Sequence, residues 1–86
     1  MYKRQLIIPN PTNGTFKLML SDHDYIQGYL EIRIHDLYGK MIHQQQISRY
    51  NGTFEGAISL VPYPTGVYIL ELVNAKTHRL VKIIKE

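Results

Sequence analysis

The sequence contains no cysteine among its 86 residues. This absence excludes a disulfide framework, a thiolate zinc site and a cysteine nucleophile. Long apolar runs are also missing: the longest, residues 67–70, ends at Glu71 and falls far short of the roughly 20 residues that cross a bilayer as a helix. The net charge is only +3, which permits weak contact with anionic surfaces but does not single out nucleic acid as a partner.

The first residues do not resemble a secretory signal. Only Leu6, Ile7 and Ile8 separate the basic beginning from Pro9, and three apolar residues are too few for the core of a signal peptide. Two interpretations follow, a cytosolic chain or a fragment of a larger exported precursor, and we favour the second. We therefore expect residues 1–86 to form one domain of a larger secreted protein, because a chain of this length supports only one small core.

Apolar and polar residues alternate along most of the chain. Residues 15–20, 30–35 and 67–72 each place aliphatic or aromatic side chains at every second position, which is the pattern of strands with one buried face. In residues 80–85 both faces are partly apolar, so we expect this last strand to be flanked on two sides. Turn residues separate these segments, and about seven short strands result. Their spacing predicts an all-β sandwich or barrel, and no window shows a sustained helical period.

Three of the turns have specific chemistry. Asn13 and Gly14, next to Pro9, Asn10 and Pro11, tolerate the positive φ angles of a tight turn. Asp36 is expected to accept hydrogen bonds from the backbone of the turn that follows, with Gly39 at positive φ and Lys40 pointing outward. Gly66 is expected to supply a backbone shape or a close approach that a side chain would block, and Tyr68 to lie in the core with its hydroxyl at the rim.

Four segments occur in a fixed order along the whole chain: Pro9, Asn10, Pro11, Thr12, Asn13 and Gly14; then residues 34–40 with Asp36, Gly39 and Lys40; then residues 60–69 with Gly66, Val67 and Tyr68; and last the basic, apolar residues 81–86. This order resembles the type A C-terminal sorting domain of the type IX (Por) secretion system of Bacteroidetes. The second proline of the Pro62 and Pro64 pair departs from the pattern, in which a single proline is more usual.

The resemblance implies a fold and a set of partners. The fold would be a small immunoglobulin-like antiparallel β-sandwich of about seven strands. The domain would direct a cargo protein, joined at its N-terminal side, through the type IX outer-membrane translocon to the cell surface or medium, and a sortase-like signal peptidase would then remove it. The resemblance implies neither catalysis nor a cofactor.

The residues expected to carry recognition follow from the same resemblance. They are Lys82, Ile83, Ile84 and Lys85 of the last strand together with Gly66, Val67 and Tyr68, and the motif turns are formed by Pro9, Asn10, Pro11, Gly14, Asp36, Gly39 and Lys40. Lys82 and Lys85 are expected to present their charge outward. Because a terminal strand is tethered at one end only, it can be peeled away or exchanged, and a translocon could bind it by strand addition. A strand-swapped homodimer is a further possibility.

The same residues allow other functions. The tyrosines could instead form a carbohydrate-binding or adhesion surface on an exported enzyme, or the chain could be a spacer domain. Asp22, His23 and Asp24 could suggest a metal site, but neighbouring residues of an extended loop point apart, so we predict no metal. No serine has the context of a nucleophile, and no glycine-rich loop leads into a helix.

Overall fold

The computed structural model describes residues 3–22, 28–74 and 78–86, and within them all side chains except those of residues 3–8, 22 and 49. Strands and turns account for the architecture, and in this part of the chain no helix is long and apolar enough to span a membrane. The strands, in chain order, are β1 (Lys3–Ile8), β2 (Thr15–Asp22), β3 (Gly28–His35), β4 (Met41–Tyr50), β5 (Thr53–Ser59), β6 (Gly66–Asn74) and β7 (His78–Lys85).

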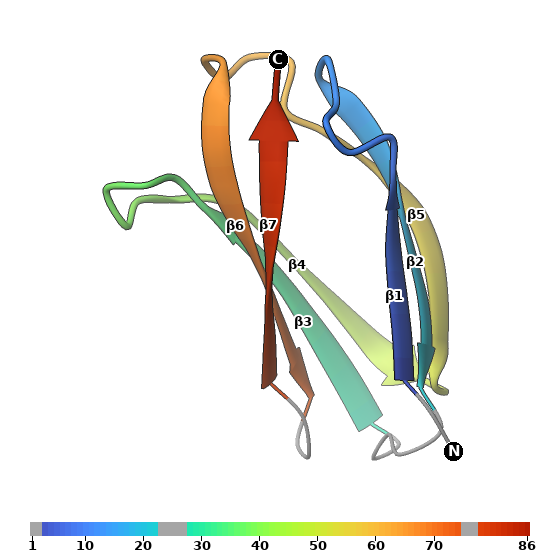
Figure 1. Cartoon of the computed structure of the whole chain (residues 1–86). Helices are drawn as coiled ribbons and strands as arrows, with labels where there is room; N and C mark the ends of the chain where they lie inside the picture. Colours follow the sequence, from blue (N-terminus) through green and yellow to red (C-terminus); the bar gives the residue numbers. More distant parts are fainter. Residues whose placement is uncertain (1–2, 23–27, 75–77) are drawn as a thin grey trace.

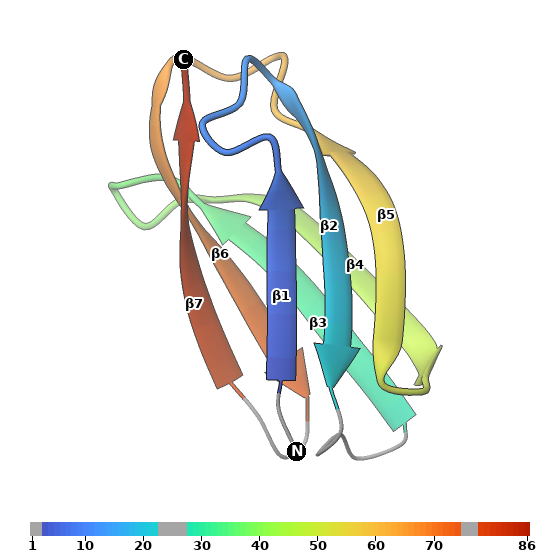
Figure 2. The same ribbon diagram turned by 45° about the vertical axis from the view of Figure 1, so that its right-hand side comes forward.

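The strands form two layers (Figures 1 and 2). One sheet has the order β1-β2-β5 and the other the order β4-β3-β6-β7, and all paired strands are antiparallel. This confirms the expected all-β sandwich. The fourth strand pairs with β3 rather than with β5, so the domain is immunoglobulin-like in the general sense of two facing antiparallel sheets.

The core lies between the two sheets and follows the alternation of the sequence. The register of β3 and β6 places Ile32 opposite Leu72 and Ile34 opposite Leu70, so large aliphatic side chains meet on the inner face. The other sheet contributes Phe16, Leu18 and Ile58, all buried. Burial of such side chains stabilises a fold by about 1.5–3 kcal/mol each, so this layer is the main source of stability.

A sheet of three strands faces a sheet of four, and β4 is therefore covered only in part. β4 lies at the edge of its sheet, and Gln44, Gln45 and Gln46 are all exposed. An alternating pattern is absent there because neither face is fully buried. The three glutamines thus form an exposed strand edge.

The four motif segments lie at one end of the sandwich, which we call the motif end. It contains the β1–β2 connection, the β3–β4 hairpin, the β5–β6 loop and the last residues of β7, whereas β1 begins at the opposite end (Figures 1 and 2). The strands run alternately up and down, so every second connection falls at the same end. The topology thus gathers segments that are far apart in the sequence.

Candidate functional site

The β3–β4 hairpin is built around Asp36. Its Oδ1 accepts hydrogen bonds from the amides of Tyr38 and Lys40, each at 2.9 Å, and the Asp36 amide donates to the Lys40 carbonyl at 2.9 Å. Gly39 has a φ of 85°, a conformation that suits glycine. The expected turn is confirmed, and its consequence is that Leu37 and Tyr38 stand at the tip with 66% and 96% of their surface exposed.

The β5–β6 loop is held by two tyrosine hydroxyls. Tyr68 lies in the core, as expected, and its hydroxyl donates to the Pro64 carbonyl at 2.5 Å, which anchors the loop to the strand that follows it. Tyr63 donates across to the Ile42 carbonyl of β4 at 3.1 Å. Burial raises the pKa of Tyr68, and nearby Asp36 and Tyr63 act in the same direction, so its hydroxyl keeps the proton that it donates.

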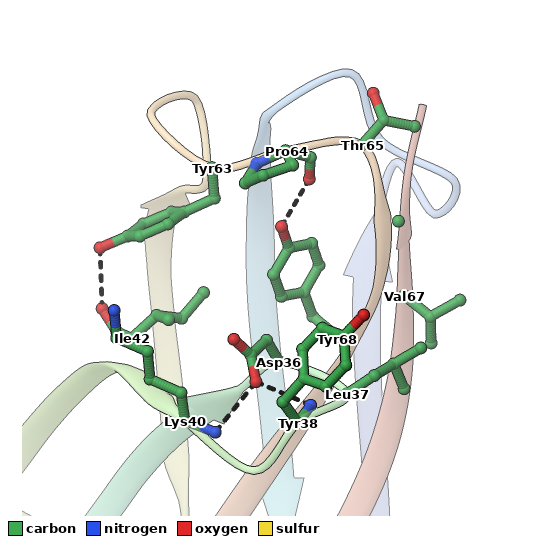
Figure 3. A pocket seen from close by; sticks show the side chains of 11 residues that line it. Asp36, Leu37, Tyr38, Lys40, Ile42, Tyr63, Pro64, Thr65, Val67 and Tyr68 are labelled. Atoms are coloured by element: carbon green, nitrogen blue, oxygen red, sulfur yellow. Dashed lines mark hydrogen bonds between the residues drawn. The ribbon is translucent and has the colours of Figure 1, made fainter.

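A cavity of about 340 Å³ lies between this hairpin and this loop (Figure 3). Asp36 and Lys40 line one side, while Pro64, Val67 and Tyr68 line the other. Oδ1 of Asp36 is already occupied by backbone amides, so the hairpin carboxylate serves the turn. The cavity is therefore a mixed apolar and polar recess suited to receiving a side chain.

Gly66 begins β6 at the edge of the cavity. Its φ of 154° is unfavourable for residues with a side chain, yet a Cβ built at this position would meet no atom within 4 Å. Of the two roles expected for this glycine, the backbone shape is confirmed and the close approach is wrong. Val67 follows it and is half-buried.

Lys85 corrects one expectation about the terminal strand. It was expected to present its charge outward, but only 8% of the residue is exposed. Its Nζ donates to the carbonyl oxygens of Leu60 at 3.0 Å, of Val61 at 3.2 Å, and of Tyr63. The alternation of β7 explains this, because Lys85 shares the inner face with the fully buried Ile83, and a buried ammonium must find acceptors there.

Lys82 and Ile84 occupy the other face of β7. Lys82 is exposed, as expected, and Ile84 is half-buried. Among the four residues expected to carry recognition on β7, these two are the accessible ones in the folded domain. Ile83 and Lys85 instead tie β7 to the core and to the β5–β6 loop.

The segment after β1 has a role that the sequence did not reveal. Residues 10–12, which we call the strap, lie along the outer edge of β7. The Thr12 amide donates to the Ile84 carbonyl at 2.8 Å, and the Glu86 amide donates to the Thr12 carbonyl at 2.7 Å. Pro9 and Pro11 stay exposed, and the peptide bond between Asn10 and Pro11 is cis.

Asn10 extends the strap through its side chain. Its Nδ2 donates to the Lys82 carbonyl and its Oδ1 accepts from the Ile84 amide, both at 3.1 Å. Gly14 closes the segment, and its carbonyl accepts from the Leu60 amide at 2.7 Å. The strap and Lys85 therefore fasten the last residues of β7, in addition to the pairing of β7 with β6.

A charged cluster lies on the outer face of the four-stranded sheet. Glu71 has a side chain only 14% exposed, and it receives Arg33 at 3.4 Å and His35 at 3.1 Å, with His78 also in contact. Burial alone would raise the pKa of Glu71, but hydrogen bonds from His35, His78 and Arg33 outweigh it and hold the pKa below its ordinary value. This cluster joins β3, β6 and β7 on the outer face and stabilises the sheet.

The features weighed for other functions do not converge. Tyr38, Tyr63 and Tyr68 line the recess, whereas Tyr29 is exposed at the opposite end and Tyr50 is buried, so the described tyrosines are not gathered on one sheet face. His23 and Asp24, weighed as metal ligands, lie outside the described residues. Elsewhere, in residues 3–22, 28–74 and 78–86, no group of three or more histidine or acidic side chains is placed to hold a metal ion.

The chain matches a known protein family. A family model described as a secretion system C-terminal sorting domain matches residues 6–86, which include all four motif segments. No curated protein matches the chain.

Proposed function

The chain belongs to the family of secretion system C-terminal sorting domains, and on that premise we propose that its motif end is the surface that the type IX outer-membrane translocon recognises. The domain is a C-terminal sorting signal for type IX secretion. It acts with the type IX machinery on a cargo joined at its N-terminal side, and the cargo reaches the cell surface or the medium. Domains of this family are in general non-catalytic.

The observation that carries the proposal is the recess between the Asp36 hairpin and the β5–β6 loop. It has a volume of about 340 Å³, and the exposed Leu37 and Tyr38 stand at its rim. Exposed apolar side chains grouped beside a recess are typical of a surface that binds another protein. The same end contains Lys40 and Val67. It also contains Lys82 and Ile84, which lie on the outer face of β7.

The place where the cargo joins the domain also favours the motif end as the recognised surface. β1 begins at the end opposite the motifs (Figure 2), so a cargo that precedes β1 is attached about one strand length away from the recess. A strand of six to eight residues spans roughly 20–27 Å. The motif end thus stays accessible while the domain is joined to a large folded protein.

A pair of matched substitutions tests this proposal. Leu37 and Leu80 are 66% and 65% exposed, but Leu37 lies at the rim of the recess and Leu80 near the start of β7. In an exported reporter fused to residues 1–86, Leu37→Ser combined with Tyr38→Ser should reduce surface delivery several-fold, and Leu80→Ser should leave it unchanged. Both proteins should unfold at the same temperature as the wild type, since exposed changes alter stability little. Equal delivery by all three fusions would refute the proposal.

Deletion of residues 81–86 is a less specific test. It should abolish delivery, but it also removes the fully buried Ile83 and the Lys85 contacts. Loss of a large buried aliphatic side chain costs about 2–5 kcal/mol, a large share of the stability of a domain of this size. Substitutions on the surface therefore separate recognition from folding better than truncation does.

Finer statements extend the proposal. We propose that the domain is of type A and comes from a member of the Bacteroidetes, that residues 1–86 are one domain of a larger secreted protein, and that it is itself without catalytic activity. Its four motifs in order support the subtype. A sortase-like peptidase would remove the domain after export, and mass spectrometry of the exported cargo tests this, since a cargo that retains residues 1–86 would contradict removal.

A strand-swapped homodimer is a separate proposal. Exchange of β7 between two copies would rebuild the same contacts with β6 and with the strap in each copy. The swapped dimer would therefore have the same contacts per chain as the monomer. Light scattering of the purified domain distinguishes the states. A mass of 10.0 kDa, that of one chain, would rule out exchange, and twice that mass would support it.

A further inference from the structure

The outer edge of β7 carries a short parallel ladder. Thr12 bridges to Lys85 by the two hydrogen bonds that a parallel strand makes, one to the Ile84 carbonyl and one from the Glu86 amide. The Asn10 side chain makes the same pair of bonds two residues earlier, to the Lys82 carbonyl and from the Ile84 amide. The positions advance together, from Asn10 beside Ile83 to Thr12 beside Lys85.

Asn10 can take this place because its carboxamide has the same donor and acceptor as a peptide group. A strand residue offers one N–H and one C=O to its neighbour, and Nδ2 and Oδ1 of Asn10 offer both at 3.1 Å. Aspartate at this position would keep the acceptor and lose the donor. The strap thus supplies the terminal half of β7 with a strand neighbour from within the domain.

From these contacts we infer that the translocon binds the domain while the strap is closed on β7, and that Asn10 is a positioning residue that holds it closed. This inference rests on the proposed function. The outer edge from Lys82 to Glu86 is already filled, so a partner cannot add a strand there. Recognition then proceeds through side chains that the closed strap holds in place at the motif end, and Lys82 and Ile84 are the ones that β7 displays.

The cost of opening the strap supports the closed form. Four hydrogen bonds of 2.7–3.1 Å close this edge, and each favours the closed state by roughly 2- to 13-fold. Together they favour it by a factor on the order of 10–10⁴. A partner that required the open edge would lose that factor in affinity. The closed strap also leaves a second copy of the domain no free strand edge from Lys82 to Glu86.

A disulfide lock tests the inference, and the absence of native cysteine makes the lock unambiguous. Asn13 and Glu86 each follow the bridged pair of Thr12 and Lys85 by one residue, and both are exposed. The fusion with Asn13→Cys and Glu86→Cys, oxidised in the periplasm, should be delivered within about twofold of the fusion with serine at both positions. Retention of the oxidised form while the serine form is delivered would overturn the inference.

A second variant keeps the inference testable if the disulfide does not form. In Asn10→Asp a carboxylate oxygen replaces Nδ2 opposite the Lys82 carbonyl oxygen, so one bond is lost and a repulsion is added. This variant should lower delivery several-fold, whereas Asn51→Asp, the same change at an exposed residue at the opposite end that uses only its Oδ1, should not. Amide hydrogen exchange supplies a readout that a general loss of stability would not give. Because the strap opens more often in Asn10→Asp, the amides of Ile84 and Glu86 should exchange several-fold faster, while that of Ile83, which faces β6, is unchanged.

Two results separate this inference from the proposed function. If the wild-type fusion is not delivered, the proposed function fails. If the wild type is delivered and Asn10→Asp is delivered equally well despite faster exchange at Ile84, only the inference fails.

Discussion

Replacement of Lys85 by methionine should destabilise the domain while leaving the β7 backbone in place. Methionine is similar in length and apolar, so it fills much of the same space but donates no hydrogen bond. The carbonyl groups of Leu60, Val61 and Tyr63 would then lose their common donor. The β5–β6 loop, which lines the recess, would lose its attachment to β7.

The magnitude follows from three bonds to one ammonium. A hydrogen bond to a charged group contributes about 1.5–3 kcal/mol, and removal of the donor leaves buried acceptors unpaired. Loss of a buried charge returns part of the desolvation cost, and two of the three bonds are only partly buried, so water can reach the loop. We therefore expect a loss of about 2–4 kcal/mol in the free energy of unfolding.

Urea unfolding followed by circular dichroism measures this loss. With a slope of about 1 kcal/mol per molar urea for a small domain, the midpoint should fall by roughly 2–4 M. Lys82→Met is the matched control, because Lys82 is exposed on the same strand and its replacement should change stability by less than about 0.5 kcal/mol. Equal midpoints for the two variants would refute the reasoning that Lys85 fastens the strand.

Three further predictions concern other contacts. Tyr68→Phe removes the bond to the Pro64 carbonyl and should cost about 0.5–1.5 kcal/mol; calorimetry should show a lower Tm, and an unchanged Tm would contradict the role of the hydroxyl. Asp36→Ala removes the acceptor for two turn amides and should cost about 1 kcal/mol, whereas Asp36→Asn keeps an acceptor and should cost less; equal losses in chemical unfolding would count against the turn. The pKa of Glu71 lies below its ordinary value of 4.5, so its contribution to stability is present above that value and is lost as the pH falls through the lowered one. Stability of Glu71→Gln should therefore fall less steeply below pH 4.5 than that of the wild type, and parallel profiles would contradict the assignment.

Local patterns in the sequence predicted much of the fold. The alternation of Leu30, Ile32 and Ile34 identified the inner face of β3, since a period of two leaves only one way to bury all three. The Asp36 turn was equally predictable, because its carboxylate accepts hydrogen bonds from backbone amides two and four residues later, and the glycine lies between them. Both features depend on residues that are close in the sequence.

The contacts of the terminal strand were not predicted in the same way. Lys85 shares the face of Val81 and Ile83, so its position indicated burial, but its charge favoured exposure and the acceptors lie 22–25 residues away. Asn10 contacts Lys82 and Ile84 across 72 and 74 residues. No local pattern marks such a pair, because an asparagine between two prolines is also an ordinary turn.

Export of a reporter fused ahead of residues 1–86 tests the central claim most directly. The measurement is the fraction of reporter that external protease can reach, compared between cells that contain the type IX outer-membrane translocon and otherwise identical cells that lack it. The account predicts that most of the reporter is accessible in the first cells and that it stays in the periplasm of the second. Equal accessibility in both, or retention in both, would contradict it.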